Sequence, residues 1–422
     1  MDALRIQGQR PLSGELEVSG SKNASLPIMT AALLANGVST LHRVPGLADV
    51  KTLGKVLGHL GVEVGQEGST LRLDATELST HEAPYELVRT MRASILVLGP
   101  LLARLGKARV SLPGGCAIGA RPIDQHLKGL RKLGATIEIS HGYVEAHVNG
   151  RLKGATVIFD MPTVGGTENL LLAASLAEGT TILENAAREP EVVDLCHTLI
   201  GMGAKITGVG TATLSIEGVE ALKPFDHHVV ADRIEFGTFL VAGAMLGEKL
   251  LIKGGVAEHQ TFLIDKLRGM GALIEETSEG LEVSRPKDSE LRATDVETQP
   301  YPGFPTDMQA QLMAATSIAE GSSTFSETVF ENRFMHVAEL GRMGANIRVD
   351  GGKAIVRGVQ ELSGATVMAT DLRASACLVL AALAAEGESV VRRIYHLDRG
   401  YESIEKKLSA AGAIIERFRE EG

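Results

Sequence analysis

Residues 173–186, AASLAEGTTILENA, decide the fold, because the same succession of an apolar run, a glycine and a β-branched stretch recurs six times along the chain. The apolar run predicts a helix, Gly179 predicts the left-handed residue that ends it, and TTIL predicts the strand that follows. The six glycines in this position are Gly37, Gly106, Gly179, Gly247, Gly321 and Gly387.

A second marker follows each of these joins, an apolar pair, then glycine, then usually alanine and another strand. Its glycines are Gly61, Gly134, Gly203, Gly271, Gly344 and Gly412. Successive copies lie roughly 70 residues apart, a period typical of a repeated supersecondary structure. Each repeat therefore predicts a helix, a strand, a second helix, a strand and a final hairpin strand.

Six repeats predict an α/β protein of two domains with three repeats in each. A boundary is expected near residues 225–228, after the third repeat. Residues 4–20, LRIQGQRPLSGELEVSG, precede any helix and are predicted as a strand that pairs with the second half of the chain. The predicted domains are residues 1–20 with 231–422, and residues 21–230. We expect the ligand in the cleft between them, opened and closed by a hinge motion.

The composition narrows the class of protein. The chain has 422 residues, 4% aromatic residues and no tryptophan, so its core is expected to be aliphatic. A formal charge of −10 argues against a nucleic-acid or anionic membrane partner. No apolar run is long enough for a transmembrane helix, and the N-terminal stretch lacks the features of a signal peptide. Three widely spaced cysteines predict a reducing, cytoplasmic setting.

Residues 112–122, LPGGCAIGARP, carry one of those cysteines between glycines. The glycines favour a mobile flap, and Arg121 near Cys116 favours the reactive thiolate. Pro122 fits the first turn of a new helix. The alternative interpretation is a tight turn around a buried cysteine, and the loop alone does not separate the two.

Basic residues recur where helices are predicted to start. A helix N-terminus repels its own cations, so N-terminal capping does not explain these residues, although it does explain Ser21, Thr163 and Asp371. We interpret the set as a shared anion site, with scattered surface charge as the alternative. Asp307, which follows YPGFPT, is either a general base or an ordinary cap. The basic residues are Lys22, Arg92, Arg121, Arg333, Arg373 and Arg399.

Several motifs resemble the UDP-N-acetylglucosamine 1-carboxyvinyltransferases, enolpyruvyl transferases of the EPSP synthase family. They include SKNASLPIMTAALLA (21–35), LPGGCAIGARPIDQHLKGLRKLGA (112–135), YPGFPTDMQAQ (301–311) and FENRFMHVAELGRMGA (330–345). The resemblance implies a two-domain inside-out α/β barrel of six βαβαββ-type repeats. It implies transfer of the enolpyruvyl group of phosphoenolpyruvate to the 3′-hydroxyl of UDP-N-acetylglucosamine, the first committed step of peptidoglycan synthesis, with neither metal nor organic cofactor.

The same resemblance assigns roles to residues. Cys116 would protonate C3 and form a covalent phosphoenolpyruvate adduct, and Asp307 would be the base; Lys22 and Arg399 complete the implied catalytic set. Implied phosphoenolpyruvate ligands are Lys22, Asn23, Arg121, Arg373 and Arg399. Implied sugar-nucleotide ligands are Asn23, Arg92, Arg121, Pro122, Ile123, Asp124, Gln125, Val164, Gly165, Asp307 and Val329. Arg333 and Glu191 would support the site.

Two other functions remain open on the motifs. A 3-phosphoshikimate 1-carboxyvinyltransferase shares the fold and the phosphoenolpyruvate chemistry, but its pattern lacks the LPGGCAIG flap. A non-catalytic sugar-nucleotide-binding paralogue is disfavoured by the intact Cys116, Asp307 and Lys22. One departure is Met161, where some members of the resembled family carry a lysine near the nucleotide phosphates. A cysteine at position 116 implies sensitivity to the thiol-alkylating epoxide fosfomycin.

Overall fold

The computed structural model describes residues 2–89, 91–112, 123–286 and 289–420. They form two compact units. The terminal unit comprises Met1–Ser19 and Ala231–Gly422, and the central unit comprises Gly20–Gly115 and Arg121–Val230, in each case apart from the residues outside the described ranges. The chain thus passes from one unit to the other near residues 19–20 and again near residues 230–231.

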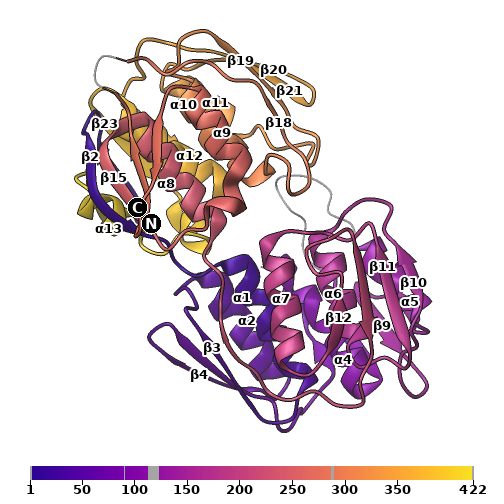
Figure 1. Ribbon diagram of the computed structural model, residues 1–422. Coiled ribbons are helices and arrows are strands. Elements are labelled where there is room, and N and C mark those ends of the chain that lie inside the picture. The colour runs from indigo at the N-terminus through magenta and orange to yellow at the C-terminus, as the bar shows by residue number, and fades with distance from the viewer. Residues whose placement is uncertain (1, 90, 113–122, 287–288, 421–422) are drawn as a thin grey trace. The chain divides into compact units, whose positions relative to one another are not determined.

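Each unit contains three four-stranded sheets within the described residues (Figure 1). The sheets of the central unit, in strand order, are β14 (Asp226–His228), β3 (Val38–His42), β5 (Thr70–Asp74) and β4 (Glu63–Glu67); β6 (Glu82–Ala83), β7 (Lys107–Ser111), β9 (Tyr143–His147) and β8 (Thr136–Ser140); and β10 (Thr156–Ile158), β11 (Thr180–Glu184), β13 (Thr213–Glu217) and β12 (Lys205–Thr207).

The terminal unit repeats this plan. Its sheets are β16 (Leu273–Glu276), β17 (Gly280–Ser284), β15 (Gly247–Lys253) and β2 (Leu12–Glu17); β18 (Val296–Glu297), β19 (Ser322–Ser326), β21 (Lys353–Arg357) and β20 (Asn346–Asp350); and β22 (Thr366–Met368), β23 (Glu388–Arg392), β1 (Asp2–Gln7) and β24 (Ile414–Arg419). In every sheet one edge pair is parallel and the two remaining pairs are antiparallel.

The strands bury one face each. In the sheet that holds the opening stretch of sequence, Val157 lies opposite Leu183, and Leu183 lies opposite Leu214. All three side chains are buried, while their neighbours along the strands are more exposed. This alternation is the two-residue period of a sheet that packs on helices with one face only.

The first helix of each repeat is buried on all sides. Nearly every residue of these helices is buried, except in the last turn of α4, as expected where a helix is apolar around its whole circumference. In each unit these helices lie inside and the sheets cover them (Figure 1). They are α1 (Lys22–Ala31), α4 (Leu98–Leu105), α6 (Val164–Ala174), α8 (Arg233–Leu246), α10 (Gln309–Thr316) and α12 (Leu372–Ala384).

The second helix of each repeat has one apolar face, which packs on inner helices and neighbouring strands, and one more exposed face. These helices are α2 (Ala48–His59), α5 (Asp124–Lys132), α7 (Pro190–Gly201), α9 (Thr261–Gly269), α11 (His336–Arg342) and α13 (Ile404–Ala410). Short helices precede or extend the first and second helices of the repeats. They are α3 (Tyr85–Val88), η1 (Ala32–Leu34), η2 (Arg92–Val97), η3 (Ala257–Gln260), η4 (Thr306–Met308) and η5 (Ile394–Arg399). The prediction of an inside-out α/β fold with six repeats is confirmed.

The N-terminal stretch corrects one detail of the sequence analysis. Residues 4–20 are not a single strand, because the chain turns after Gln7 and forms β1 and β2 in two different sheets of the terminal unit. Gln9 has a φ of 57°, and a Cβ on Gly8 would lie 1.9 Å from the carbonyl oxygen of Ala385. This contact is distant in sequence, so no local pattern predicts the turn.

The marker glycines follow the prediction with one exception. Eleven of the twelve have positive φ, as residues that end helices in the left-handed region do. Gly247 is different, with φ −71° and ψ 126°, and it is the first residue of β15. Glycine is needed there for space, because a Cβ would lie 2.5 Å from the carbonyl oxygen of Gly243.

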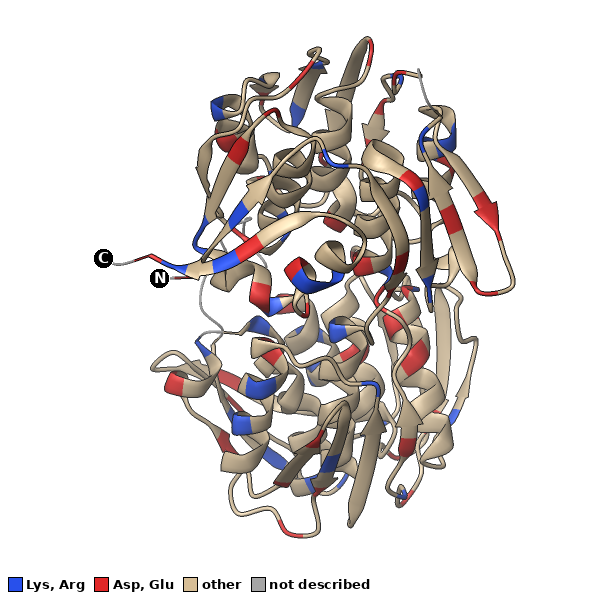
Figure 2. Cartoon of the chain, turned by 90° about the vertical axis from the view of Figure 1, so that its left-hand side faces the viewer, with Lys and Arg blue, Asp and Glu red and all other residues tan. Residues whose placement is uncertain are grey.

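Charge is mixed over both units. Lysine and arginine residues alternate with aspartate and glutamate along the outer strands and helices of each unit (Figure 2). Among the described residues, no helix combines the length and apolar character needed to cross a membrane.

Candidate active site

Asp307 is held between two arginines in the terminal unit. It lies in η4, which leads directly into α10. Its Oδ1 accepts a hydrogen bond from Nη2 of Arg333 at 2.6 Å, and its Oδ2 accepts one from Nη2 of Arg373 at 3.1 Å. The side chains of Arg333 and Arg373 are 6% and 5% exposed. The structure thus brings together three of the predicted residues from two repeats.

The charges around Asp307 determine its protonation. Burial by itself would raise its pKa, but the positive charges of Arg373, Arg333 and Arg233 outweigh burial and hold the pKa well below its usual range. For Arg373, burial by itself would lower the pKa, but Asp307, Tyr401 and Asp232 together outweigh burial and raise it. The group is therefore a carboxylate that can orient a hydroxyl, and it is a weak base while both arginines remain in place.

The remaining predicted residues of the terminal unit lie in neighbouring turns. Arg399 ends η5 and is half-buried; together with burial and Arg393, its charge lowers the pKa of His396. Val329 is also half-buried, and its backbone N–H donates to Oε1 of Glu327 at 2.9 Å. Glu327 was not predicted as a site residue.

Lys22 begins α1 in the central unit. Ser21 caps this helix, since its Oγ accepts from the backbone N–H of Ala24 at 3.2 Å, as predicted. Nζ of Lys22 lies 3.2 Å from Oδ2 of Asp49, and both side chains are close to fully buried. Asp49 lies in the first turn of α2, so the ion pair joins the starts of two helices. Asn23, the next residue of α1, is half-buried.

The sequence analysis missed Asp49. The residues predicted at helix starts do not include the second helix of the first repeat, where this carboxylate occupies the first turn. A polar residue at this position of one repeat, when the same position carries charge in other repeats, is the signal that would have found it.

The starts of α5 and α6 lie together in the central unit. The Oε1 of Gln125 accepts from the backbone N–H of Asp160 at 2.8 Å, and a Cβ on Gly165 would lie 3.3 Å from the His126 ring. Val164 begins α6 after its cap, Thr163. Among the predicted nucleotide ligands near this point, Ile123 is buried, Asp124 is exposed, and Gln125, Val164 and Gly165 are half-buried.

His126 lies under these helix starts and is held by Asn169. Its Nδ1 lies 3.1 Å from Nδ2 of Asn169, which also donates to the carbonyl oxygen of Ile95. Burial, with a further contribution from the charge of Arg92, lowers the pKa of His126 to about 4. The ring is therefore neutral at pH 7, and because Nδ1 accepts from an amide, the ring hydrogen is on Nε2. Arg92, one of the predicted residues, thus lies near these starts at the beginning of η2.

Glu191 belongs to a group of acidic residues at the start of α7. It is 3% exposed. Glu168 in α6 is fully buried, and its pKa is raised well above the usual value, first by burial and then by the charges of Glu191 and Glu189. Burial and the two neighbouring carboxylates thus favour the protonated form of Glu168. It was not predicted, because an acidic residue inside an apolar helix has no distinguishing pattern.

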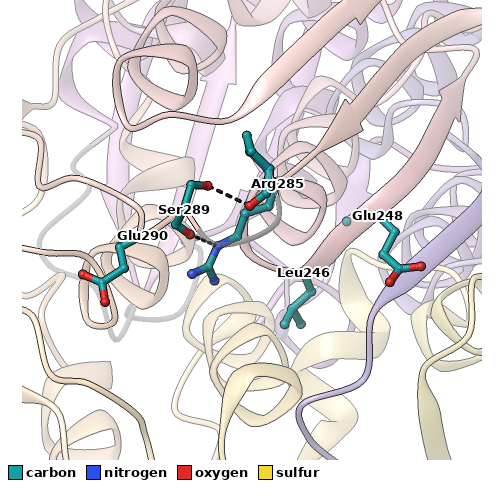
Figure 3. A pocket seen from close by; sticks show the side chains of 7 residues that line it. Leu246, Glu248, Arg285, Ser289 and Glu290 are labelled. Atoms are coloured by element: carbon teal, nitrogen blue, oxygen red, sulfur yellow. Dashed lines mark hydrogen bonds between the residues drawn. The ribbon is translucent and has the colours of Figure 1, made fainter.

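Three predicted residues, Cys116, Arg121 and Pro122, lie outside the described part of the chain, so their roles stay predictions. The terminal unit also contains a pocket of about 370 Å³ next to the C-terminal end of α8, lined by Leu246, Glu248, Arg285 and neighbouring residues (Figure 3). Since α8 has 14 residues, its two ends are roughly 20 Å apart. This pocket is therefore distinct from the helix starts that carry the predicted residues.

The fold has six repeats with charged residues at helix starts. Comparison of this chain with known sequences identifies the class of protein to which such a fold belongs. Residues 6–408 match the family EPSP synthase (3-phosphoshikimate 1-carboxyvinyltransferase), and the chain belongs to this family. Within it, the chain is 60% identical over 423 residues to the UDP-N-acetylglucosamine 1-carboxyvinyltransferase of Anaeromyxobacter sp. (strain K), with 99% of this chain and 100% of the relative covered. The protein of the same name from Trichlorobacter lovleyi is 58% identical over 420 residues, with both chains fully covered. The predicted resemblance is confirmed.

Solved structures agree with this assignment. The enolpyruvyl transferase NikO from Streptomyces tendae matches with a TM-score of 0.87 and 28% identity over 99% of this chain and 98% of that chain. EPSP synthase from Acinetobacter baumannii matches with a TM-score of 0.77 and 18% identity over 99% and 100% of the two chains, a likeness that shows the fold alone.

Proposed function

We propose that the protein transfers the enolpyruvyl group of phosphoenolpyruvate to the 3′-hydroxyl of UDP-N-acetylglucosamine and releases phosphate. The observation that carries this proposal is the 60% identity, over the full length, to proteins named for that reaction. The site supports it, because Asp307, Lys22 and Arg373 are present where helices start. Arg399 is present too, but it ends η5 and does not begin a helix as predicted. By the same similarity we place the protein in the cytoplasm, at the first committed step of peptidoglycan synthesis.

The reaction balances as an addition followed by an elimination. In the addition, the hydroxyl oxygen bonds to C2 of phosphoenolpyruvate, C3 gains a proton from the Cys116 thiol, and the hydroxyl proton passes to Asp307. In the elimination, C3 gives a proton back to the Cys116 thiolate, the double bond forms again and the C2–O bond to phosphate breaks. The hydroxyl proton held by Asp307 leaves with the phosphate. Fixed cations, which we assign as Lys22, Arg121 and Arg399, would stabilise the charge of the tetrahedral adduct.

The low pKa of Asp307 bears on the order of the first step. A free sugar hydroxyl is far too weak an acid to lose its proton to such a carboxylate. As the oxygen bonds to C2, however, it acquires positive charge and its acidity rises steeply. We therefore place proton transfer to Asp307 late, after the new bond has begun to form, and assign Asp307 to orient the hydroxyl before that point.

Phosphate release separates the candidate functions. Purified protein with phosphoenolpyruvate would be assayed with UDP-N-acetylglucosamine, with shikimate 3-phosphate and with no acceptor. We expect phosphate only in the first reaction. Release with shikimate 3-phosphate instead would favour the sister activity, and nucleotide binding without any release would favour a non-catalytic paralogue.

Cys116 gives a further test of the proposed site. Fosfomycin alkylates a thiol, so we expect it to inactivate the wild-type protein and to add one adduct on Cys116. The variant Cys116→Asp has no thiol at that position and should keep its activity in the presence of the inhibitor. Inhibition of the variant to the same extent would show that the epoxide acts elsewhere.

A further inference from the structure

Glu327 is a buried carboxylate with both oxygens occupied. It directly follows β19 and is 8% exposed. Its Oε1 accepts from Oγ1 of Thr298 at 2.9 Å and from the backbone N–H groups of Val329 and Phe330 at 2.9 and 3.1 Å. Its Oε2 accepts from Oγ1 of Thr306 at 2.9 Å. This arrangement satisfies a buried charge with four donors, and leaves the carboxylate no evident room to act on a substrate itself.

One arm of this network leads to Asp307. A threonine hydroxyl has a single hydrogen, and Thr306 donates it to Glu327. Its lone pair is then free to accept from Nη1 of Arg333 at 3.3 Å, while Nη2 of the same guanidinium donates to Oδ1 of Asp307 at 2.6 Å. A guanidinium can only donate, so Thr306 accepts from Arg333 and gives its own hydrogen to Glu327. Glu327 thereby orients the Thr306 hydroxyl that holds Nη1 of Arg333.

The other arm holds the turn of residues 328–330. Glu327 caps two successive backbone N–H groups there, and Thr298 accepts from the backbone N–H of Thr328 at 3.0 Å. Oγ1 of Thr328 in turn donates to the carbonyl oxygen of Thr298. The turn contains Val329, which the resemblance assigns to the sugar nucleotide. A single carboxylate thus ties this turn to the residue next to Asp307.

We propose that Glu327 is a positioning residue of the acceptor side of the site, which fixes the Arg333 guanidinium on Asp307 through Thr306 and fixes the turn of Val329 through its backbone. The proposal rests on the proposed function for the identity of the acceptor. It assigns Glu327 no contact with substrate, and it predicts different kinetic consequences for the two arms.

Substitution of Glu327 by glutamine acts on the first arm. Backbone N–H groups can only donate, so the amide oxygen has to take the place of Oε1, and the amide nitrogen then faces Thr306. Thr306 becomes an acceptor from both sides, and its own hydrogen loses its acceptor. We expect Glu327→Gln and Thr306→Val to lower kcat about tenfold, the effect of ~1.4 kcal/mol on the barrier, with the KM for nucleotide nearly unchanged.

Substitution of Thr298 acts on the second arm. Thr298→Val removes a donor to Oε1 and an acceptor for the turn, but leaves the link from Glu327 to Thr306. We expect the KM for nucleotide to rise with little change in kcat, the signature of lost uniform binding. Thr306→Ser keeps the hydroxyl and should recover most of the kcat that Thr306→Val loses.

A pH profile distinguishes positioning from a purely structural role. Asp307 faces Arg333, Arg373 and Arg233, and Arg373 also faces Tyr401 and Asp232. If Arg333 is loosened, the pKa of Asp307 rises, so the acid limb of kcat/KM moves to higher pH in Glu327→Gln and Thr306→Val and stays in place in Thr298→Val. The matched control is Asp295→Asn, which alters another carboxylate that accepts a backbone N–H in the same unit, that of Thr324 at 2.7 Å.

The results that overturn the proposal are equally defined. If the role is structural alone, the Glu327 and Thr306 variants have a lower melting temperature. Their kcat per folded molecule and the acid limb of their kcat/KM profile then match those of the Asp295→Asn control. If the wild-type chain releases no phosphate with UDP-N-acetylglucosamine, the proposed function fails instead. The positioning claim is then decided by a crystal structure of Thr306→Val: a guanidinium still bound to Asp307 as in the wild type rejects it, and a displaced one supports it.

Discussion

Lys407→Met should destabilise the terminal unit strongly, because it leaves a carboxylate buried without its cation. Nζ of Lys407 lies 2.8 Å from Oε1 of Glu235, whose side chain is 2% exposed. The same ammonium donates to Oγ of Ser19 at 2.7 Å, and the backbone N–H of Ser19 donates to Oε2 of Glu235 at 2.5 Å. The ion pair therefore anchors the chain at the point where it leaves the terminal unit.

The size of the effect follows from the burial of the pair. Two unit charges about 4 Å apart attract by ~4 kcal/mol at an effective dielectric constant of about 20, and desolvation of both groups offsets much of this. Removing one partner loses the attraction but keeps the desolvation of the other, which costs roughly 3–5 kcal/mol. For a unit of about 200 residues this lowers the melting temperature by roughly 6–20 °C.

The destabilisation caused by Lys407→Met should increase with pH. Burial raises the pKa of Glu235 against the opposing effect of Lys407, so folded Glu235 binds its proton more tightly than the unfolded chain does. Stability from this group is therefore lost as pH rises from the unfolded towards the folded pKa. Without Lys407, the pKa of Glu235 in the folded protein rises further. Each pKa unit of that rise adds about 1.4 kcal/mol to the destabilisation by Lys407→Met at high pH relative to low pH.

Hydrogen exchange read by mass spectrometry suits this chain, which has no tryptophan for fluorescence. Peptides from α8 and α13 would report the free energy of opening at pH 5.5 and pH 8. Lys249→Met is the control, since Lys249 makes an exposed pair with Glu282 at 3.5 Å and its loss should cost less than about 1 kcal/mol. The double variant Glu235→Gln with Lys407→Met removes both charges and should recover most of the loss. The reasoning is refuted if Lys407→Met costs no more than the control, or costs the same at both pH values.

Two further predictions concern the buried cysteines and two glycines. Cys196 and Cys377 are buried, and burial raises the pKa of both thiols, to about 12 for Cys196. Iodoacetamide at pH 8 should therefore leave both unmodified in the folded protein, so that any label found by peptide mapping lies on Cys116; labelling of either buried thiol would contradict this. Gly358→Ala should destabilise by about 1–3 kcal/mol, because its Cβ would lie 1.6 Å from a backbone oxygen, whereas Gly341→Ala, with open space at an exposed helix position, should stabilise by up to about 1 kcal/mol. Denaturant titration of both variants tests the pair, and equal effects would count against the steric argument.

The repeated pattern predicted most of the fold because its signals are local. A buried helix, the glycine that ends it and the strand after it all leave a mark within about 25 residues of sequence. The short parallel edge strands escaped prediction, since β6 and β18 have only two residues each and no periodicity can be read from them. The prediction for Gly247 was wrong for a related reason. The sequence does not distinguish a glycine required for close approach of the backbone from one required for positive φ.

The site was predictable where a charge occupies a repeated position. Arg373 and Asp307 were predicted as site residues because they are polar residues at the starts of apolar helices, and the structure pairs them. Glu327 and Asp49 are buried, but Glu327 lies in a turn and Asp49 at the start of a second helix. The role of each becomes evident only from its partner in another segment. Contacts between segments distant in sequence are what a single sequence leaves undetermined.

The architecture itself explains why the charges gather at helix starts. Helix α8 is buried from Ile234 to Met245, and the one charged residue in that range, Glu235, lies in its first turn. Only its N-terminal end, where Asp232 caps the helix and Arg233 begins it, can carry charge. The same holds for α12, which begins after its cap Asp371. Because the fold repeats, the starts of α8, α10 and α12 come near enough for Arg233 and Arg373 to act on one carboxylate, that of Asp307. A repeat with an apolar first helix can therefore contribute chemistry at one end only, and three such repeats concentrate their polar groups in one place.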